Sequence, residues 1–172
     1  GVSRVRSLEI ILALGNVQAT EAEKNKWLVQ KNEEYLSYLV TMDEKELLPG
    51  VPRVLEFIKE HHQFITLGSA SKNARPILEK TKILHYFDAI VDGNDVSNAK
   101  PDPEVFMRAA QLVGVSNTNA IVFEDSVAGI QAANTAQMIS IGIGDPTVLH
   151  EAQHNFKDFN SIEESFLEKL LN

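Results

Sequence analysis

The second part of the sequence alternates short apolar segments with segments of helical periodicity, and this alternation constrains the fold most. Four apolar runs, "FITLG", "FDAIV", "AIVFE" and "MISIGIG", are separated by "NARPILEKTKIL", "DPEVFMRAAQLVG" and "SVAGIQAANTAQ". Apolar strands that alternate with helices form a parallel sheet with both faces covered. We therefore predict an α/β fold, with a further helix at about 51–60 and a last helix carrying Ile162, Phe166 and Leu170 on one stripe.

The first 47 residues read as helix only. Thr20 is a good N-cap for a long helix that follows it. One face of that helix is predicted to carry Leu28, Asn32, Tyr35 and Leu39. "LLPGVP" then breaks the pattern with two prolines and a glycine. We predict a small helical cap domain at 1–47 and an α/β core domain at 48–172.

Charge and composition exclude several classes of function. The chain has 24 acidic and 16 basic residues, for a net charge of −8, which argues against broad nucleic-acid binding but leaves room for a local basic pocket. There is no cysteine, and the five histidines have no metal-ligand spacing. No apolar run approaches the roughly 18 residues of a membrane helix. We expect a cytoplasmic monomer with no membrane or nucleic-acid partner.

Two adjacent carboxylates, Glu124 and Asp125, follow the apolar run "AIVF". In an open α/β sheet this strand exit is where ligands bind. Neighbouring carboxylates repel each other and are costly to desolvate, and a hard cation such as Mg²⁺ relieves both effects. The alternative is that Asp125 only caps the helix that starts near Ser126.

Further polar groups follow other strands. "FITLG" leads into Ser69-Ala70-Ser71-Lys72-Asn73, and Lys100 stands directly before "PDP". A serine there can be a simple helix cap, and a loop lysine can be a solvated charge. Together, however, a hydroxyl, a cation and a metal-binding acid pair at one end of a sheet suit phosphoryl transfer, which needs positioning and charge neutralisation.

Three segments, "ITLGSAS", "AKPDPEVF" and "IVFEDSVAGI", resemble in order and spacing the second, third and fourth motifs of the haloacid dehalogenase-like phosphotransferases. "GVSR", "QKN" and "SASKN" are similar to the β-phosphoglucomutase group within that superfamily. The resemblance implies its Rossmannoid parallel sheet with a small helical cap, and Mg²⁺ as cofactor. It implies that Asp125 binds the metal directly, with Glu124 as ligand or close support, and that Ser69 and Lys100 hold the phosphoryl group in transfer.

The resemblance also implies a second set of residues that grip the remainder of the substrate. The residues at the non-transferring phosphate would be Arg4, Ser71 and Asn73, with Lys72 beside them, and those facing the sugar would be Lys31 and Asn32. Ordinary alternatives exist for three of them. Arg4 can be an exposed arginine, although it opposes the dipole of the helix it opens. Lys31 can cover aromatic surface beside Trp27 and Tyr38, whereas Asn32 on an apolar stripe needs a hydrogen-bond partner.

The family's nucleophile, an aspartate in a D-x-D pair after the first strand, has no counterpart in these 172 residues. Asp92 and Asp95 follow a different strand at a different spacing, and we assign them no such role. In this fold the first strand lies between "FITLG" and "AIVFE", so its absence would leave two unpaired edges and a large void. We expect a preceding segment of a few dozen residues, the alternative being an inactive remnant.

The function predicted for the complete protein is Mg²⁺-dependent interconversion of a hexose 1-phosphate and a hexose 6-phosphate through an aspartyl-phosphate, with β-glucose 1-phosphate as first substrate. The partner would be a small phosphorylated sugar. The alternatives are a sugar-phosphate phosphatase on the same fold and a phosphosugar-binding protein without a nucleophile.

Overall fold

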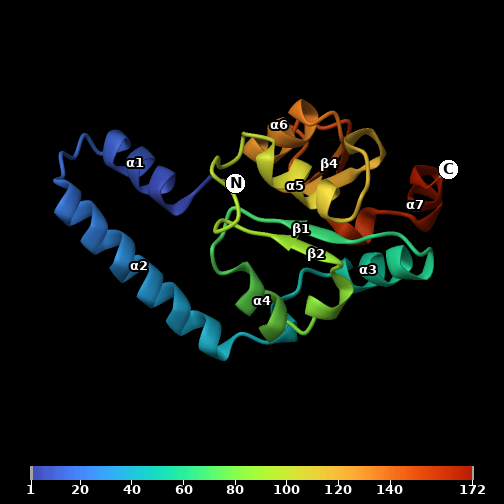
Figure 1. Cartoon of the computed structure of the whole chain (residues 1–172), viewed down its shortest axis with the longest axis horizontal. Helices are drawn as coiled ribbons and strands as arrows, with labels where there is room; N and C mark the ends of the chain where they lie inside the picture. Colours follow the sequence, from blue (N-terminus) through green and yellow to red (C-terminus); the bar gives the residue numbers. More distant parts are fainter. Residues whose placement is uncertain (1, 172) are drawn as a thin grey trace.

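The structure is a computed structural model and describes residues 2–171. Two helices, α1 (Arg4–Leu14) and α2 (Glu21–Thr41), come first and extend from one side of the α/β region (Figure 1). Thr20 caps α2 in a capping box with Glu23, as its sequence predicts. The expected inner face of α2 is its less exposed one, and Leu39 is buried. On α1, Val5 is exposed.

The α/β region follows the predicted alternation. Its strands are β1 (Thr66–Gly68), β2 (Ala89–Val91), β3 (Ile121–Glu124), β4 (Ile139–Ile143) and β5 (His154–Phe156). Its helices are α3 (Val51–Glu60), α4 (Ala74–Lys80), α5 (Glu104–Leu112), α6 (Val127–Thr135) and α7 (Glu164–Leu170). The sequence analysis missed β5, because "HNF" has no periodicity of its own and is ordered as a strand by pairing with β4.

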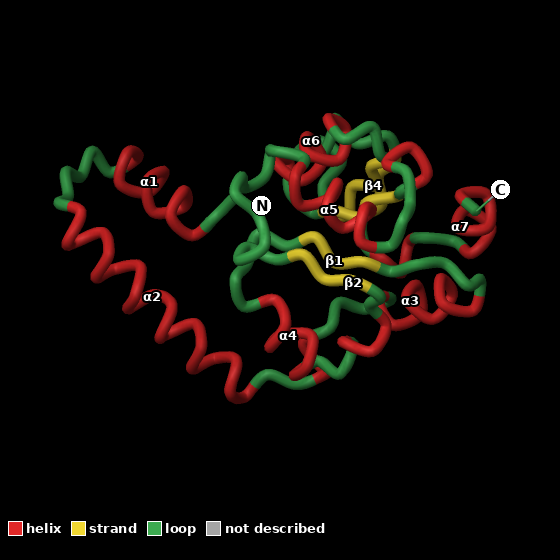
Figure 2. The backbone as a smooth tube through the Cα atoms, viewed as in Figure 1, coloured by secondary structure: helices red, strands yellow, loops and turns green. Residues whose placement is uncertain are grey.

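All strand pairs are parallel, as expected. β1 pairs with β2, and β3, β4 and β5 form a second sheet in that order. Figure 2 shows the two groups of strands as separate. Within residues 2–171, therefore, β1 and β3 each keep one edge that pairs with no other strand.

An apolar cavity of about 390 Å³ lies between the two sheets. Its walls include Leu67 from β1, Val122 from β3 and Phe106 from α5. This is the place between "FITLG" and "AIVFE" where the sequence analysis expects a void. The cavity separates the strands, but it leaves their carboxyl ends on the same side of the molecule, bridged by the side chains described below.

The described residues form two buried hydrophobic clusters. One buried cluster joins α5 and α6 to β2 and β3 through Phe106, Ala109, Val122 and Ala132. The other joins α3 and α7 to β4 through Val54, Phe57, Ile141 and Leu167.

Among the described residues, no helix has the length and apolar character needed to cross a lipid bilayer. The division into domains at 47/48 stays a prediction.

Candidate functional site

Lys100 is the central side chain of the candidate site and is buried, with only 7% of its surface exposed. Its Nζ donates to the Gly68 carbonyl at 3.1 Å and to Glu124 Oε2 at 2.7 Å. These partners end β1 and β3, so one ammonium spans the exits of both sheets. The alternative that Lys100 is a solvated loop charge is wrong.

Glu124 is held on both of its oxygens. While Oε2 accepts from Lys100, Oε1 accepts from the Ser126 backbone N–H at 3.1 Å and from its hydroxyl at 2.7 Å. Burial acts to raise the pKa of Glu124, but the Lys100 ammonium and the hydrogen bond from Ser126 outweigh it, so the pKa is lowered. Glu124 is therefore an ionised, fixed carboxylate.

Gly129 makes room for the Glu124 side chain. A Cβ built at this position in α6 would overlap the carboxylate and its neighbouring carbon. Glycine inside a helix costs about 1 kcal/mol relative to alanine, and here its lack of a side chain lets Glu124 fold against the helix. The sequence analysis did not single out Gly129, although a glycine inside a helical pattern is a usable signal.

Asp125 is exposed and is not the helix cap. Ser126 is the N-cap of α6 and accepts from the Gly129 N–H at 3.1 Å, so the capping alternative for Asp125 is wrong. Partial burial, and then the adjacent negative charge of Glu124, raise the pKa of Asp125. The ionised form of this carboxylate is therefore the one that a bound cation would stabilise.

The acid pair fits a magnesium ion in part. Both groups supply hard oxygens, and Mg²⁺ is commonly held by one or two carboxylates together with water and phosphate oxygens. Asp125 is open to such a cation, whereas the oxygens of Glu124 already accept from protein donors. Within residues 2–171 no group of three or more His, Cys, Asp or Glu side chains could hold a metal by itself.

The loop after β1 is ordered by its own serines. The Ser69 hydroxyl accepts from the Ser71 N–H at 3.1 Å, and the Ser71 hydroxyl accepts from the Asn73 N–H at 3.1 Å. Asn73, and neither serine, is the N-cap of α4. Ser69 directly follows Gly68 in the chain, and the Gly68 carbonyl accepts from the Lys100 ammonium. The backbone therefore brings Ser69 next to a residue that contacts the ammonium.

The turn after β2 supports this loop, a role that sequence analysis missed. The Gly93 N–H donates to the Ser71 carbonyl at 3.2 Å, and Asn94 Nδ2 donates to the Lys72 carbonyl at 3.1 Å. The buried Asp92 accepts in turn from the backbone and side-chain amides of Asn94. Asp92 therefore has a structural role, which is to hold the turn after β2. Its position directly after a predicted strand is the sequence feature from which this role could have been inferred.

Asn32 on α2 is hydrogen-bonded to the loop after β1. Its Oδ1 accepts from Asn73 Nδ2 at 3.1 Å, so the partner that an amide on an apolar stripe requires is present. Arg4 and Lys31 instead make contacts within the first two helices. Arg4 donates to the Leu28 carbonyl at 3.4 Å, and Lys31 Nζ lies 5.3 Å from the Tyr35 ring centroid. The Lys31 ammonium therefore lies over Tyr35, an aromatic residue that the sequence analysis did not name as its neighbour.

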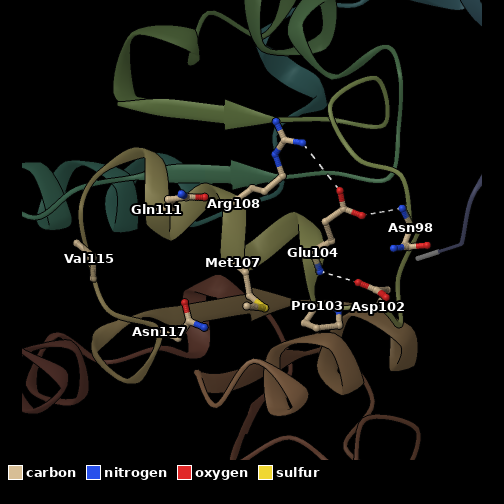
Figure 3. A pocket seen from close by; sticks show the side chains of 9 residues that line it. All are labelled: Asn98, Asp102, Pro103, Glu104, Met107, Arg108, Gln111, Val115 and Asn117. Atoms are coloured by element: carbon tan, nitrogen blue, oxygen red, sulfur yellow. Dashed lines mark hydrogen bonds and ion pairs between the residues drawn. The ribbon is translucent and has the colours of Figure 1, made fainter.

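A second hollow, of about 570 Å³, lies beside α5 (Figure 3). Its acidic groups are already engaged: Glu104 accepts from the Ser97 and Asn98 N–H groups, and Asp102 accepts from the Glu104 N–H at 2.9 Å. The Ser97 and Asn98 backbone bonds lower the pKa of Glu104. These contacts brace the segment that leads to Lys100.

The fold and site define a parallel α/β protein whose polar and charged groups gather at the carboxyl ends of its strands. The chain belongs to the haloacid dehalogenase-like hydrolase family, whose family description matches residues 4–143. It is 38% identical over 146 residues to beta-phosphoglucomutase of Bacillus subtilis, which covers 84% of this chain. A crystal structure of beta-phosphoglucomutase from Clostridium difficile superposes with a TM-score of 0.92 and 35% identity, over 99% of this chain and 77% of that chain.

Phosphatases are also among the relatives. The fructose-1-phosphate phosphatase YqaB of Escherichia coli is 37% identical over 102 residues, which are 59% of this chain. This chain spans 65% of the length of the Bacillus enzyme and 54% of the length of the Escherichia coli phosphatase. Both relatives are therefore longer than the aligned part, and their activities bear on this chain only as a proposal.

Proposed function

We propose that the complete protein interconverts a hexose 1-phosphate and a hexose 6-phosphate, with β-glucose 1-phosphate as its first substrate. The observation that carries this proposal is the buried Lys100 ammonium between the Gly68 carbonyl and Glu124. A lysine ammonium has three N–H donors. Two are engaged here, which leaves one for an oxygen of the transferring phosphoryl group.

The surrounding residues take the remaining roles. Ser69 offers a hydroxyl to the same phosphoryl group, and Asp125 would hold Mg²⁺, with Glu124 in support. The metal, when bound, would neutralise charge on the phosphoryl oxygens. Glu124 keeps the Lys100 ammonium at the strand exit. The acceptor aspartate of an aspartyl-phosphate would come from outside these residues, which contain no D-x-D.

The cap side of the site supplies the grip on the rest of the substrate. Asn73 and Ser71 lie on one short loop, and Asn32 reaches that loop from α2. In the proposal these groups, with Arg4, Lys31 and Lys72, hold the second phosphate and the sugar. Closure of the first two helices over the core would exclude water and favour transfer to sugar over hydrolysis.

A sugar-phosphate phosphatase is the second candidate, favoured by the similarity to the fructose-1-phosphate phosphatase. The two functions differ only in whether a sugar hydroxyl or water receives the phosphoryl group. The test is to incubate the natural full-length protein with Mg²⁺ and a panel of hexose phosphates, followed by ³¹P NMR. Isomerised sugar phosphate supports the mutase, and free phosphate alone supports the phosphatase. Tight binding with no turnover would indicate a phosphosugar-binding protein.

A further inference from the structure

Phe106 on α5 makes a third contact with Lys100. Its ring centroid lies 4.5 Å from Nζ, with the ammonium over the ring. Phe106 is 7% exposed and belongs to the buried cluster around α5 and α6. A cation this close to an aromatic face is attracted by the ring quadrupole, and more strongly when both groups are removed from water.

Gly68 brings the ring and the ammonium together. A Cβ at Gly68 would lie 2.7 Å and 2.9 Å from two carbons of the Phe106 ring. Only glycine therefore lets the ring pack directly against β1 at this point. The carbonyl of the same Gly68 accepts from Lys100. One residue thus sets the position of both the ring and a hydrogen-bond acceptor around the ammonium.

We propose that Phe106 is a positioning residue, whose ring face holds the Lys100 ammonium at the strand exits while the lysine keeps a donor for phosphate. This inference rests on the proposed function. A third hydrogen-bond acceptor in place of the ring would use the remaining N–H donor. The ring attracts the charge through its face instead, so it fixes the ammonium without taking up that donor.

The test replaces Phe106 in the natural full-length protein by phenylalanines with one, two and three ring fluorines. Fluorination keeps the shape of the side chain nearly constant while it withdraws charge from the ring face. Inorganic phosphate is the probe, titrated by calorimetry with Mg²⁺ present. We expect affinity to fall with each fluorine, by about 5- to 30-fold in all, the loss that corresponds to a desolvated cation–π contact. Phe106→Tyr keeps the ring face and should retain the affinity.

The same fluorine series at Phe57, a buried phenylalanine of the other core cluster, should leave phosphate affinity unchanged. A flat series at Phe106, or an equal loss at Phe57, would overturn the proposal. A second measurement separates it from the proposed function. Fluorination of Phe106 should lower the free energy of unfolding with Lys100 present and have little effect in Lys100→Met. If the unsubstituted protein bound no phosphate, the proposed function would fail. If fluorination of Phe106 lowered the free energy of unfolding equally with Lys100 and with Lys100→Met, the contact between Phe106 and Lys100 would be overturned, whatever the phosphate result.

Discussion

Lys100 Nζ lies 2.7 Å from Glu124 Oε2, and the two side chains are only 6% and 8% exposed. Lys100 lies in the loop before α5 and Glu124 is the last residue of β3, 24 residues further along the chain, and the two side chains meet where β1 and β3 end. A buried pair costs desolvation energy to form, but removal of one member leaves a buried charge with no counterpart. The ion pair therefore contributes to holding the two sheets together, and it also fixes the Lys100 ammonium at the candidate site.

Glu124→Gln should lower the free energy of unfolding by about 3–5 kcal/mol, because it leaves Lys100 buried without its counter-charge. The double variant with Lys100→Met should recover much of that loss. Urea denaturation of the single and double variants measures both quantities. The exposed pair of Lys82 and Glu44 is the matched control, for which neutralisation should change little. Additive losses in the buried pair would contradict this account.

Gly129→Ala should destabilise the protein by about 1–3 kcal/mol, although alanine is the better helix former. The added methyl group would displace the Glu124 side chain, so activity should fall as well. In a Glu124→Ala background the obstacle is gone, and the same change should stabilise the protein by about 0.5–1 kcal/mol. Chemical denaturation of the four variants checks this reversal of sign, and destabilisation in both backgrounds would refute the steric explanation.

Local sequence patterns predict much of the fold, and they place several polar residues directly after its strands. The sequence reveals the strand exits at Ser69 and at Glu124-Asp125, because polar residues directly follow apolar runs there. The loop that holds Lys100 can be recognised in the same way. The burial of Lys100 was not predictable, because it depends on a partner 24 residues away. The contact of Phe106 with Lys100 was hidden for the same reason: helical periodicity assigns the ring to the core, but not to an ammonium beside it.

Arg4→Ala should impair turnover of the phosphosugar far more than hydrolysis of a generic aryl phosphate, which has no second phosphate to grip. Assays of the full-length protein on both substrates measure the difference. Arg6 lies on the same helix, is exposed and pairs with Glu9 at 3.0 Å, so Arg6→Ala is the matched control and should change neither rate. Equal losses on both substrates for Arg4→Ala would count against the mutase.

Asn32 and Asn73 form a direct hydrogen bond between α2 and the loop after β1. We predict that the alanine variants are coupled, with an interaction energy of about 0.5–1.5 kcal/mol in unfolding free energy. If the same groups also bind the sugar phosphate, each single variant should raise KM more than it lowers kcat. Asn25→Ala, on the exposed side of α2, provides a control. Strictly additive effects would show that this hydrogen bond does not form in solution.

Asp88 sets a pH dependence of stability at the opposite ends of the strands. Its carboxylate accepts from the Ile65 N–H at 2.8 Å and from Lys59 Nζ at 3.0 Å. The Ile65 bond, and then the Lys59 bond, lower its pKa in the folded protein. A carboxyl group with a lowered folded-state pKa stabilises the protein above its unfolded pKa of about 4, and this stabilisation is lost as the pH falls through the folded-state value.

Asp88→Asn keeps an acceptor but removes the charge. It should therefore lower the free energy of unfolding by about 1 kcal/mol above about pH 5, a value that allows for solvent screening of the pair with Lys59. The difference from the unsubstituted protein should shrink as the pH falls below about 4, and it should disappear once the pH is below the lowered folded-state pKa of Asp88, where Asp88 is itself protonated. Urea denaturation at a series of pH values measures it. Because Asp88 and Ile65 precede β2 and β1, whereas the candidate site follows them, phosphate affinity at neutral pH should not change. A stability difference that persisted at low pH would assign the effect to altered packing and not to the charge of Asp88.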